Sequence, residues 1–192
     1  MNADGDAMEA RALRDYYTAE DYYNTPENVR LELIDGVFYD MAPPSRKHQE
    51  IVASLCTLIS NYIKGKNGDC KVYPGPFGVQ LSENEDTVVE PDLTVICDKD
   101  KLTDRGCTGA PDWIIEVVSP NDPGHDYITK LNLYIKAGVR EYWIVDPANG
   151  SVTVYVHSGE KNEPSHYSFS DTIKVSIYED FSIDFSEISR NL

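Results

Sequence analysis

Basic residues are scarce in this chain. It has 17 lysines and arginines against 33 aspartates and glutamates among 192 residues, so its formal net charge is −16. Proteins that bind nucleic acid by broad electrostatic attraction place many lysines and arginines at phosphates. The charge balance therefore argues against that mode of binding, but it leaves room for a local basic groove or a site neutralised by a metal ion.

Several familiar signals are also missing. No apolar run approaches 18 residues, so we expect no membrane span. The opening MNADGDAMEARALRD has no basic stretch followed by an apolar one, so we expect no signal peptide. The four cysteines form no CxxC pair and no zinc-like spacing with histidine, which predicts free thiols in a reducing cytoplasm. Neither GxGxxG nor a Walker motif is present.

The hydrophobic pattern predicts an α/β fold. We expect residues 1–15 to be mobile and residues 16–192 to form one domain, with polar loops at 98–110 and 158–171. Long helices are expected over 45–64 and from Asp122 or Gly124 to Ala137. The expected strands lie at 30–41 (a hairpin around Asp35-Gly36), 71–81, 86–97, 113–118 and 141–157 (a second hairpin), with two short strands at the end. This order predicts a mixed sheet flanked by helices, with N-terminal and C-terminal hairpins.

Two carboxylates, Asp92 and Glu116, lie in runs so apolar that an ionised side chain there needs a partner or a cation. Neighbouring strands would bring them to one level, which suits Mg²⁺, because this ion often takes one or two carboxylates with water and phosphate. The alternative is that each caps a strand end or pairs with an arginine. Asp112 shares the strand of Glu116 but stands roughly 13 Å away along it, so we expect it to mark the strand's start.

The lysine that such a site would need is not in the usual place. Strand alternation puts Val118 on the face of Glu116, and valine supplies no charge. Lys130 follows on the next helix, at the flank of its apolar stripe and four residues after Asp126. Periodicity alone favours an exposed Asp126–Lys130 pair. Lys130 reaches the site only if its helix packs over it, with the amine pointing between Asp92 and Glu116.

Glu32 and His48 carry little signal by themselves. Glu32 interrupts the apolar LELI of the first hairpin, and a glutamate on a strand edge is usually solvated. His48 falls on the apolar stripe of the first long helix. A core histidine with a satisfied hydrogen bond is more common there than a catalytic one.

The motifs RLELIDG, APPSRKH, EPDLTVI, PDWIIEVVSPND, D-x₃-K-x₃-Y and AGVREYWIVDP occur in this order. Together they resemble the Uma2 family (DUF820), which is assigned to the endonucleases of the PD-(D/E)xK superfamily, over about residues 16–188. The resemblance implies a restriction-endonuclease-like fold and a divalent-metal site. Asp92 then corresponds to the aspartate of PD and Glu116 to the acidic residue of (D/E)xK. The lysine position falls on Val118, and the family pattern supplies Lys130 instead.

The resemblance also places Glu32 and His48 near the site, and it implies a mechanism. Asp92 and Glu116 would hold Mg²⁺ or Mn²⁺, with Glu32 assisting, while Lys130 would orient the attacking water for hydrolysis of DNA. His48 would contact the water or the phosphate. An active enzyme should also have a basic groove near the site, for which the sequence offers Arg46, Lys47, Lys64, Lys66 and Lys71.

Two other classes of function stay open from the residues. A non-catalytic module that keeps the fold but binds a protein or another ligand is favoured by Val118 and by the acidic charge. A glycosidase with two carboxylates has only Asp92 and Glu116 in its support and lacks an aromatic-rich sugar-binding pattern. A homodimer is a further possibility, since the strands around Tyr142, Trp143 and Val154 belong either to an interface or to the core.

Overall fold

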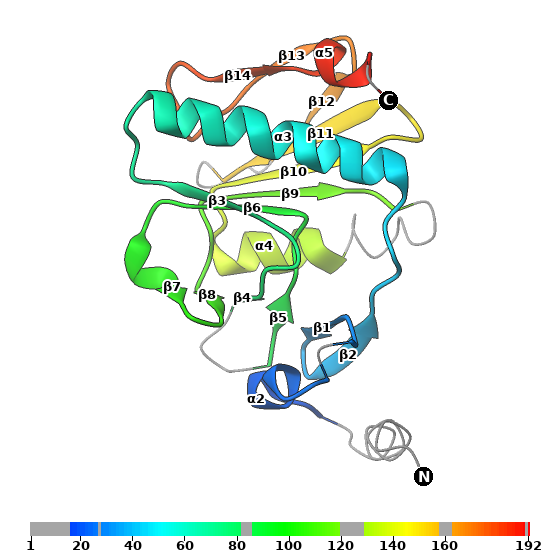
Figure 1. Ribbon diagram of the computed structural model, residues 1–192, viewed down its shortest axis with the longest axis vertical. Coiled ribbons are helices and arrows are strands. Elements are labelled where there is room, and N and C mark those ends of the chain that lie inside the picture. The colour runs from blue at the N-terminus through cyan, green and yellow to red at the C-terminus, as the bar shows by residue number, and fades with distance from the viewer. Residues whose placement is uncertain (1–15, 27, 82–85, 120–128, 158–162, 191) are drawn as a thin grey trace.

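The computed structural model describes residues 16–26, 28–81, 86–119, 129–157, 163–190 and 192 (Figure 1). The predicted mobile segment 1–15, the predicted helix start at Asp122 or Gly124, and Asp126 lie outside these residues.

The helices are α2 (Ala19–Tyr23), α3 (Arg46–Gly65), the 3₁₀-helix η1 (Lys99–Lys101), α4 (Leu131–Ala137) and α5 (Phe185–Ser189). The strands are β1 (Leu31–Ile34), β2 (Val37–Asp40), β3 (Lys71–Pro74), β4 (Val79–Gln80), β5 (Val88–Val89), β6 (Leu93–Ile96), β7 (Leu102–Thr103), β8 (Gly106–Thr108), β9 (Trp113–Val117), β10 (Glu141–Asp146), β11 (Ser151–Val156), β12 (Ser165–Ser168), β13 (Thr172–Lys174) and β14 (Ser182–Asp184).

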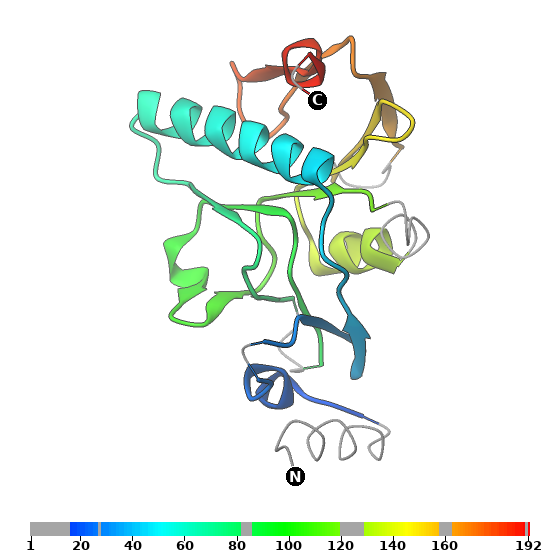
Figure 2. The same ribbon diagram turned by 45° about the vertical axis from the view of Figure 1, so that its right-hand side comes forward.

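A mixed sheet forms the centre of the fold. Its strand order is β12-β11-β10-β9-β6-β3, in which only β9 and β10 are parallel neighbours. Helix α3 covers one face of this sheet and α4 lies against the other (Figures 1 and 2). This arrangement confirms the predicted mixed sheet flanked by helices, and β13 and β14 form the predicted antiparallel pair near the C-terminus.

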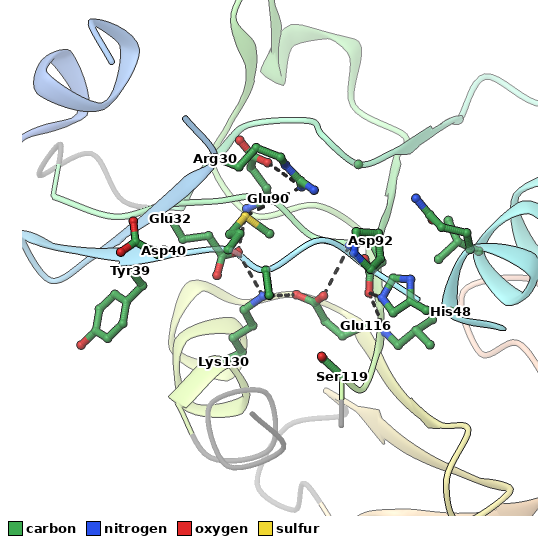
Figure 3. A pocket seen from close by; sticks show the side chains of 17 residues that line it. Arg30, Glu32, Tyr39, Asp40, His48, Glu90, Asp92, Glu116, Ser119 and Lys130 are labelled. Atoms are coloured by element: carbon green, nitrogen blue, oxygen red, sulfur yellow. Dashed lines mark hydrogen bonds and ion pairs between the residues drawn. The ribbon is translucent and has the colours of Figure 1, made fainter. Parts of the chain in front are cut away.

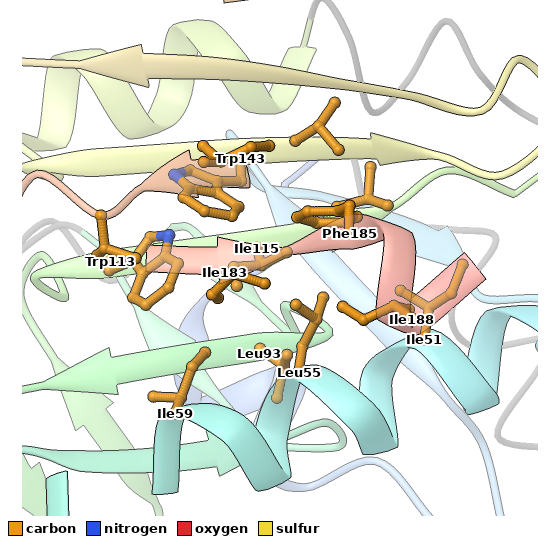
Figure 4. Packing of buried hydrophobic residues seen from close by; sticks show 14 of the residues in the cluster. Ile51, Leu55, Ile59, Leu93, Trp113, Ile115, Trp143, Ile183, Phe185 and Ile188 are labelled. Atoms are coloured by element: carbon orange, nitrogen blue, oxygen red, sulfur yellow. The ribbon is translucent and has the colours of Figure 1, made fainter. Parts of the chain in front are cut away.

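Strand β9 divides its side chains between the two faces. Trp113 and Ile115 pack in one cluster with Leu55 of α3 (Figure 4). Ile114 packs in a second cluster with Tyr134 of α4. Because successive side chains of a strand point to opposite faces, Glu116 shares the α4 side with Ile114.

The predicted strand 86–97 is two strands, and they belong to different sheets. β5 lies in a second sheet of order β2-β1-β5-β4-β8-β7, whereas β6 lies in the central one. The chain crosses between the sheets at Pro91, which has no N–H to give to a ladder. The crossing places Asp92 directly before β6, where the two sheets meet.

The two predicted polar loops contain structure in part. Segment 98–110 holds η1 and the β7–β8 pair, and segment 158–171 holds β12 at the edge of the central sheet. These strands are two to four residues long, so their sequences show too little alternation to reveal them. Helix α5 was not predicted either, because five residues give no full helical period of apolar side chains.

The expectation of four free thiols is wrong for one pair. Cys70 and Cys97 form a disulfide, whereas Cys56 and Cys107 are free. The two bonded cysteines flank β3 and β6, whose antiparallel register sets Lys71 opposite Ile96. The next pair in that register is Cys70 and Cys97, so the strands bring the two cysteines together. Their separation of 27 residues in the sequence does not reveal this contact.

The residues that raised the possibility of a homodimer lie in the core of one chain. Tyr142 is 2% exposed, Trp143 0% and Val154 4%. They therefore give no support to an interface. Among the helices in the described part of the chain, none is both long and apolar enough to cross a membrane.

Glu141 ties the C-terminal segment to the central sheet. Its buried carboxylate accepts hydrogen bonds from Trp143 Nε1 at 2.7 Å, from Ser176 N–H at 2.7 Å and from Ile177 N–H at 2.9 Å. Burial raises the pKa of Glu141, while these three donors oppose that shift.

We expect Glu141→Ala to lower the free energy of unfolding by about 3–5 kcal/mol, because three hydrogen bonds to a buried carboxylate are lost and the buried Trp143 Nε1 is left without an acceptor. Urea unfolding of the variant, with Glu141→Gln as the control that keeps an acceptor oxygen, measures the change. A loss below about 1 kcal/mol, the net value of a single ordinary hydrogen bond, would contradict this role.

Candidate active site

Asp92 and Glu116 face each other across two neighbouring strands. The β6–β9 register sets Leu93 opposite Ile115, so Asp92 stands opposite Glu116. The backbone N–H of Asp92 lies 3.4 Å from Glu116 Oε2, and the N–H of Val117 donates to Asp92 Oδ2 at 2.7 Å. The strands thus bring the carboxylates to one level, as the sequence pattern predicted.

Lys130 is buried among carboxylates. Its Nζ lies 2.9 Å from Glu116 Oε1 and 3.0 Å from Glu32 Oε1, and its side chain is 4% exposed (Figure 3). The interpretation of Lys130 as an exposed helix residue is therefore wrong. Helical periodicity counts every lysine as polar and therefore predicts that it is exposed. It carries no information about the two carboxylates, which come from strands β1 and β9. The amine lies between Glu32 and Glu116, rather than between Asp92 and Glu116 as expected.

Glu32 is buried too, at 3% exposure. Its Oε1 accepts the backbone N–H of Glu90 at 2.9 Å in addition to contacting Lys130. The interpretation of Glu32 as a solvated edge residue is wrong because β1 lies between β2 and β5, inside its sheet. β1 thereby supplies the second carboxylate around the amine.

His48 lies in the first turn of α3, where the Ser45 hydroxyl accepts its backbone N–H at 3.2 Å. Its Nε2 is 3.0 Å from Asp92 Oδ2. Its Nδ1 is buried and has no hydrogen-bond partner among the described residues. Of the two ring nitrogens, Nε2 therefore has a partner, which is a carboxylate of the site, and Nδ1 has none among the described residues. This contact fixes the orientation of Asp92.

Tyr134 is a candidate site residue to which the sequence analysis gives no role, although it is the tyrosine of the D-x₃-K-x₃-Y motif. Its hydroxyl donates to Glu116 Oε1 at 2.7 Å, and the residue is fully buried. Burial raises the pKa of Tyr134 well above 10, and the charges of Glu116 and Glu32 raise it further. The phenol therefore stays a neutral donor. The spacing K-x₃-Y puts Tyr134 one helical turn after Lys130, a signal that would have found it.

If the cavity binds a divalent ion as the sequence predicts, Tyr134→Phe should weaken Mn²⁺ binding by about 10-fold or more, since side chains that hold a metal ligand typically contribute 10–100-fold. Mn²⁺ affinity is measured by electron paramagnetic resonance, because a variant that is folded but less stable would keep the affinity of the wild type. Tyr155→Phe, which alters a ring stacked on Tyr142 and away from Glu116, is the control. Equal Mn²⁺ affinity in Tyr134→Phe and wild type would argue against a positioning role.

The candidate residues line one cavity of about 220 Å³, which contains Glu32, His48, Asp92, Glu116 and Lys130 in its wall. Asp112 lies elsewhere. Its carboxylate accepts the N–H of Cys97 at 2.8 Å and pairs with Arg140 at 2.9 Å, in keeping with its expected place at the strand's start.

The expected basic groove does not form. Arg46 and Lys64 lie 18 residues apart on α3, which corresponds to roughly 27 Å along the helix axis. Arg46 pairs with Glu50, and Lys66 pairs with Asp180. The described residues that line the cavity include none of the five lysines and arginines proposed for the groove.

The donor set at the cavity suits a divalent cation. His48 and Val117 hold one oxygen of Asp92, and Lys130 and Tyr134 hold one oxygen of Glu116. Each carboxylate has a second oxygen that can serve as a ligand. The described residues contain no group of three or more His, Cys, Asp or Glu side chains placed to hold a metal. An ion here would thus take two carboxylates and complete its shell with water and phosphate, as Mg²⁺ often does.

A mixed sheet with helices on both faces and a carboxylate at each of two adjacent inner strands defines a protein of the restriction-endonuclease-like fold. The chain belongs to the Uma2 family, described as "Putative restriction endonuclease", whose model matches residues 15–186.

Two comparisons accompany the family match. The fold is similar to a crystal structure described as "a putative nuclease belonging to DUF820" from Anabaena variabilis, with a TM-score of 0.73 and 19% identity over 89% of this chain and 96% of that one. An uncharacterized protein of Synechocystis sp. is 29% identical over 140 residues, which span 71% of this chain and 72% of that protein.

Proposed function

We propose that this protein is a divalent-metal-dependent nuclease that hydrolyses phosphodiester bonds in DNA. The observation that carries the proposal is the buried Lys130 amine, which contacts Glu116 and lies in the same cavity as Asp92. An aspartate, a glutamate and a lysine thus come together although Val118 occupies the usual lysine position. Family membership supports the same reaction class.

In this proposal Asp92 and Glu116 hold Mg²⁺ or Mn²⁺. When bound, such an ion polarises a phosphoryl oxygen and lowers the pKa of its water. Lys130 orients the attacking water and stabilises the charge that develops on the phosphate. Glu32 holds the lysine amine from its other side, while His48 keeps Asp92 in its conformation.

The charge of the cavity explains why a cation is needed. Among the described residues, its wall carries two cationic side chains, Arg30 and Lys130, against five carboxylates, which are Glu32, Asp40, Glu90, Asp92 and Glu116. A phosphate entering this cavity alone would meet net repulsion. A divalent ion on Asp92 and Glu116 would offset most of that repulsion and would hold the phosphate in the same cavity as Lys130.

Incubation of the purified protein with supercoiled plasmid and with single-stranded DNA in Mg²⁺, Mn²⁺ or EDTA tests the proposal. We expect cleavage of the single strand, of the plasmid or of both with either metal, and no cleavage in EDTA. A preparation that leaves plasmid and single-stranded DNA intact in both metals would contradict it.

The alternative is a non-catalytic module of the same fold that binds a protein or another ligand. It is favoured by the net charge of −16 and by the dispersed lysines and arginines along α3. Under this alternative the plasmid stays intact while the Lys130 amine serves only to hold Glu32 and Glu116 together.

A further inference from the structure

We propose that Arg30 and segment 41–44 form a subsite that binds the nucleotide next to the cleaved bond, in a DNA strand that is unpaired. This inference rests on the proposed nuclease function and names the substrate class of the same cavity. It is carried by the contacts of Arg30, the apolar wall beside it, and the distribution of positive charge over the chain.

Arg30 is held at one nitrogen, and its side chain is partly exposed. Its Nη2 lies 3.0 Å from Glu90 Oε2 and 3.8 Å from Met41 Sδ, while its side chain is 40% exposed. The other oxygen of Glu90 accepts the Tyr22 hydroxyl at 2.7 Å, so the carboxylate that holds Arg30 is itself fixed. Nε and Nη1 of Arg30 have no partner among the described residues. With Nη2 on Glu90, the remaining Nε–H and Nη1–H groups point in different directions, and each can donate one hydrogen bond to a phosphate.

The other cation of the cavity wall is committed elsewhere. Lys130 is enclosed by Glu32 and Glu116, at the carboxylates that would carry out the chemistry. In Figure 3, Arg30 lies on the opposite side of the Glu32 carboxylate from the Lys130 side chain. Arg30 is therefore placed to hold a phosphate that neighbours the one at Lys130, rather than the cleaved phosphate itself.

An apolar wall accompanies the guanidinium. The backbone N–H of Met41 donates to the carbonyl of Arg30 at 3.1 Å, which fixes the wall relative to the guanidinium. Met41 is also in contact with the guanidinium, and Ala42 and Pro44 of the same segment line the cavity too. An apolar surface of this kind beside a phosphate-binding arginine can pack against the sugar or the face of a base.

The depth of the site and the dispersed charge point to an unpaired strand. Glu116 and Lys130 are each 3% exposed, and the cavity of about 220 Å³ admits only part of a strand. Duplex binding depends on many phosphate contacts along the helix. The α3 cations are far apart or paired with carboxylates. A flexible strand can bend one phosphodiester into the cavity and needs only the arginine beside it.

The test is fluorescence anisotropy of a labelled single-stranded oligodeoxynucleotide and its duplex, with Ca²⁺ in place of Mg²⁺ and over a range of salt concentrations. We expect Arg30→Ala to raise the Kd for the single strand by about 10-fold or more and to reduce the salt slope by about one. Arg30→Lys keeps the charge but loses the planar group that Glu90 orients, together with its Nε and Nη1 donors, so its Kd should rise while the salt slope stays. Arg105→Ala, an exposed arginine paired with Glu20, is the matched control and should bind as wild type.

Cleavage kinetics separate this inference from the nuclease proposal. We expect Arg30→Ala to raise KM with little change in kcat, because the lost contact is made before and during the reaction alike. An active enzyme in which both Arg30 variants show wild-type Kd and KM would overturn the subsite and leave the nuclease standing. A wild type that binds the strand through Arg30 but cuts nothing would overturn the nuclease alone. If the duplex binds with the same Kd as the single strand, and Arg30→Ala raises both Kd values equally, the proposal of an unpaired substrate would be overturned.

Discussion

Lys130→Met is expected to lower kcat/KM for DNA cleavage by at least about 100-fold, and by up to about 10,000-fold, the range of a positioned proton-transfer or charge-stabilising group. The methionine fills the space of the lysine stem but provides no ammonium beside Glu116. Lys136→Met is the control, because Lys136 is exposed on the same helix and six residues further along. A Lys130→Met enzyme within about tenfold of wild type would remove the lysine from the mechanism.

The same substitution has a predicted cost in stability. Without the amine, two buried carboxylates are left facing each other, and loss of one partner of a buried ion pair typically costs about 3–5 kcal/mol. Adding Glu32→Gln removes one of the two charges, so the double variant should be more stable than Lys130→Met alone while remaining inactive. A double variant that is folded but inactive would show that Lys130→Met loses activity through the missing amine and not through unfolding.

Glu116→Gln is expected to abolish detectable Mn²⁺ binding and to lower cleavage by at least about 100-fold, because a metal ion supplies several kcal/mol of transition-state stabilisation. The amide keeps the volume of the carboxylate but removes the charge that Lys130 and the cation both need. Asp112→Asn is the matched control, since Asp112 precedes the same strand and pairs with Arg140 outside the cavity. Wild-type Mn²⁺ affinity in Glu116→Gln would place the metal elsewhere.

Local sequence signals predicted much of this fold. The apolar stripe of α3 and the alternation along β9 follow from periods that the residues display directly. These two features depend on short-range order, so the chain reveals them without knowledge of tertiary contacts. The carboxylates of Asp92 and Glu116 within two apolar runs predicted neighbouring strands that bring them to one level, which the β6–β9 register confirms.

The missed features depend on contacts between distant segments. The burial of Lys130 requires Glu32 from β1 and Glu116 from β9, and no local period encodes that meeting. The disulfide depends on the β3–β6 register. The division of 86–97 between two sheets occurs at Pro91, which lacks the N–H that a continuous ladder would need, while the apolar run around it favours a single strand.

The most direct test of the proposed chemistry is a Mg²⁺ titration of single-stranded DNA cleavage, with wild type, Lys130→Met and Glu116→Gln side by side. Circular dichroism should first show that all three are folded. We expect product from wild type that rises with Mg²⁺ and disappears in EDTA, and almost none from either variant. Product formed in EDTA, or equal cleavage by all three proteins, would contradict a metal-dependent nuclease built on Asp92, Glu116 and Lys130.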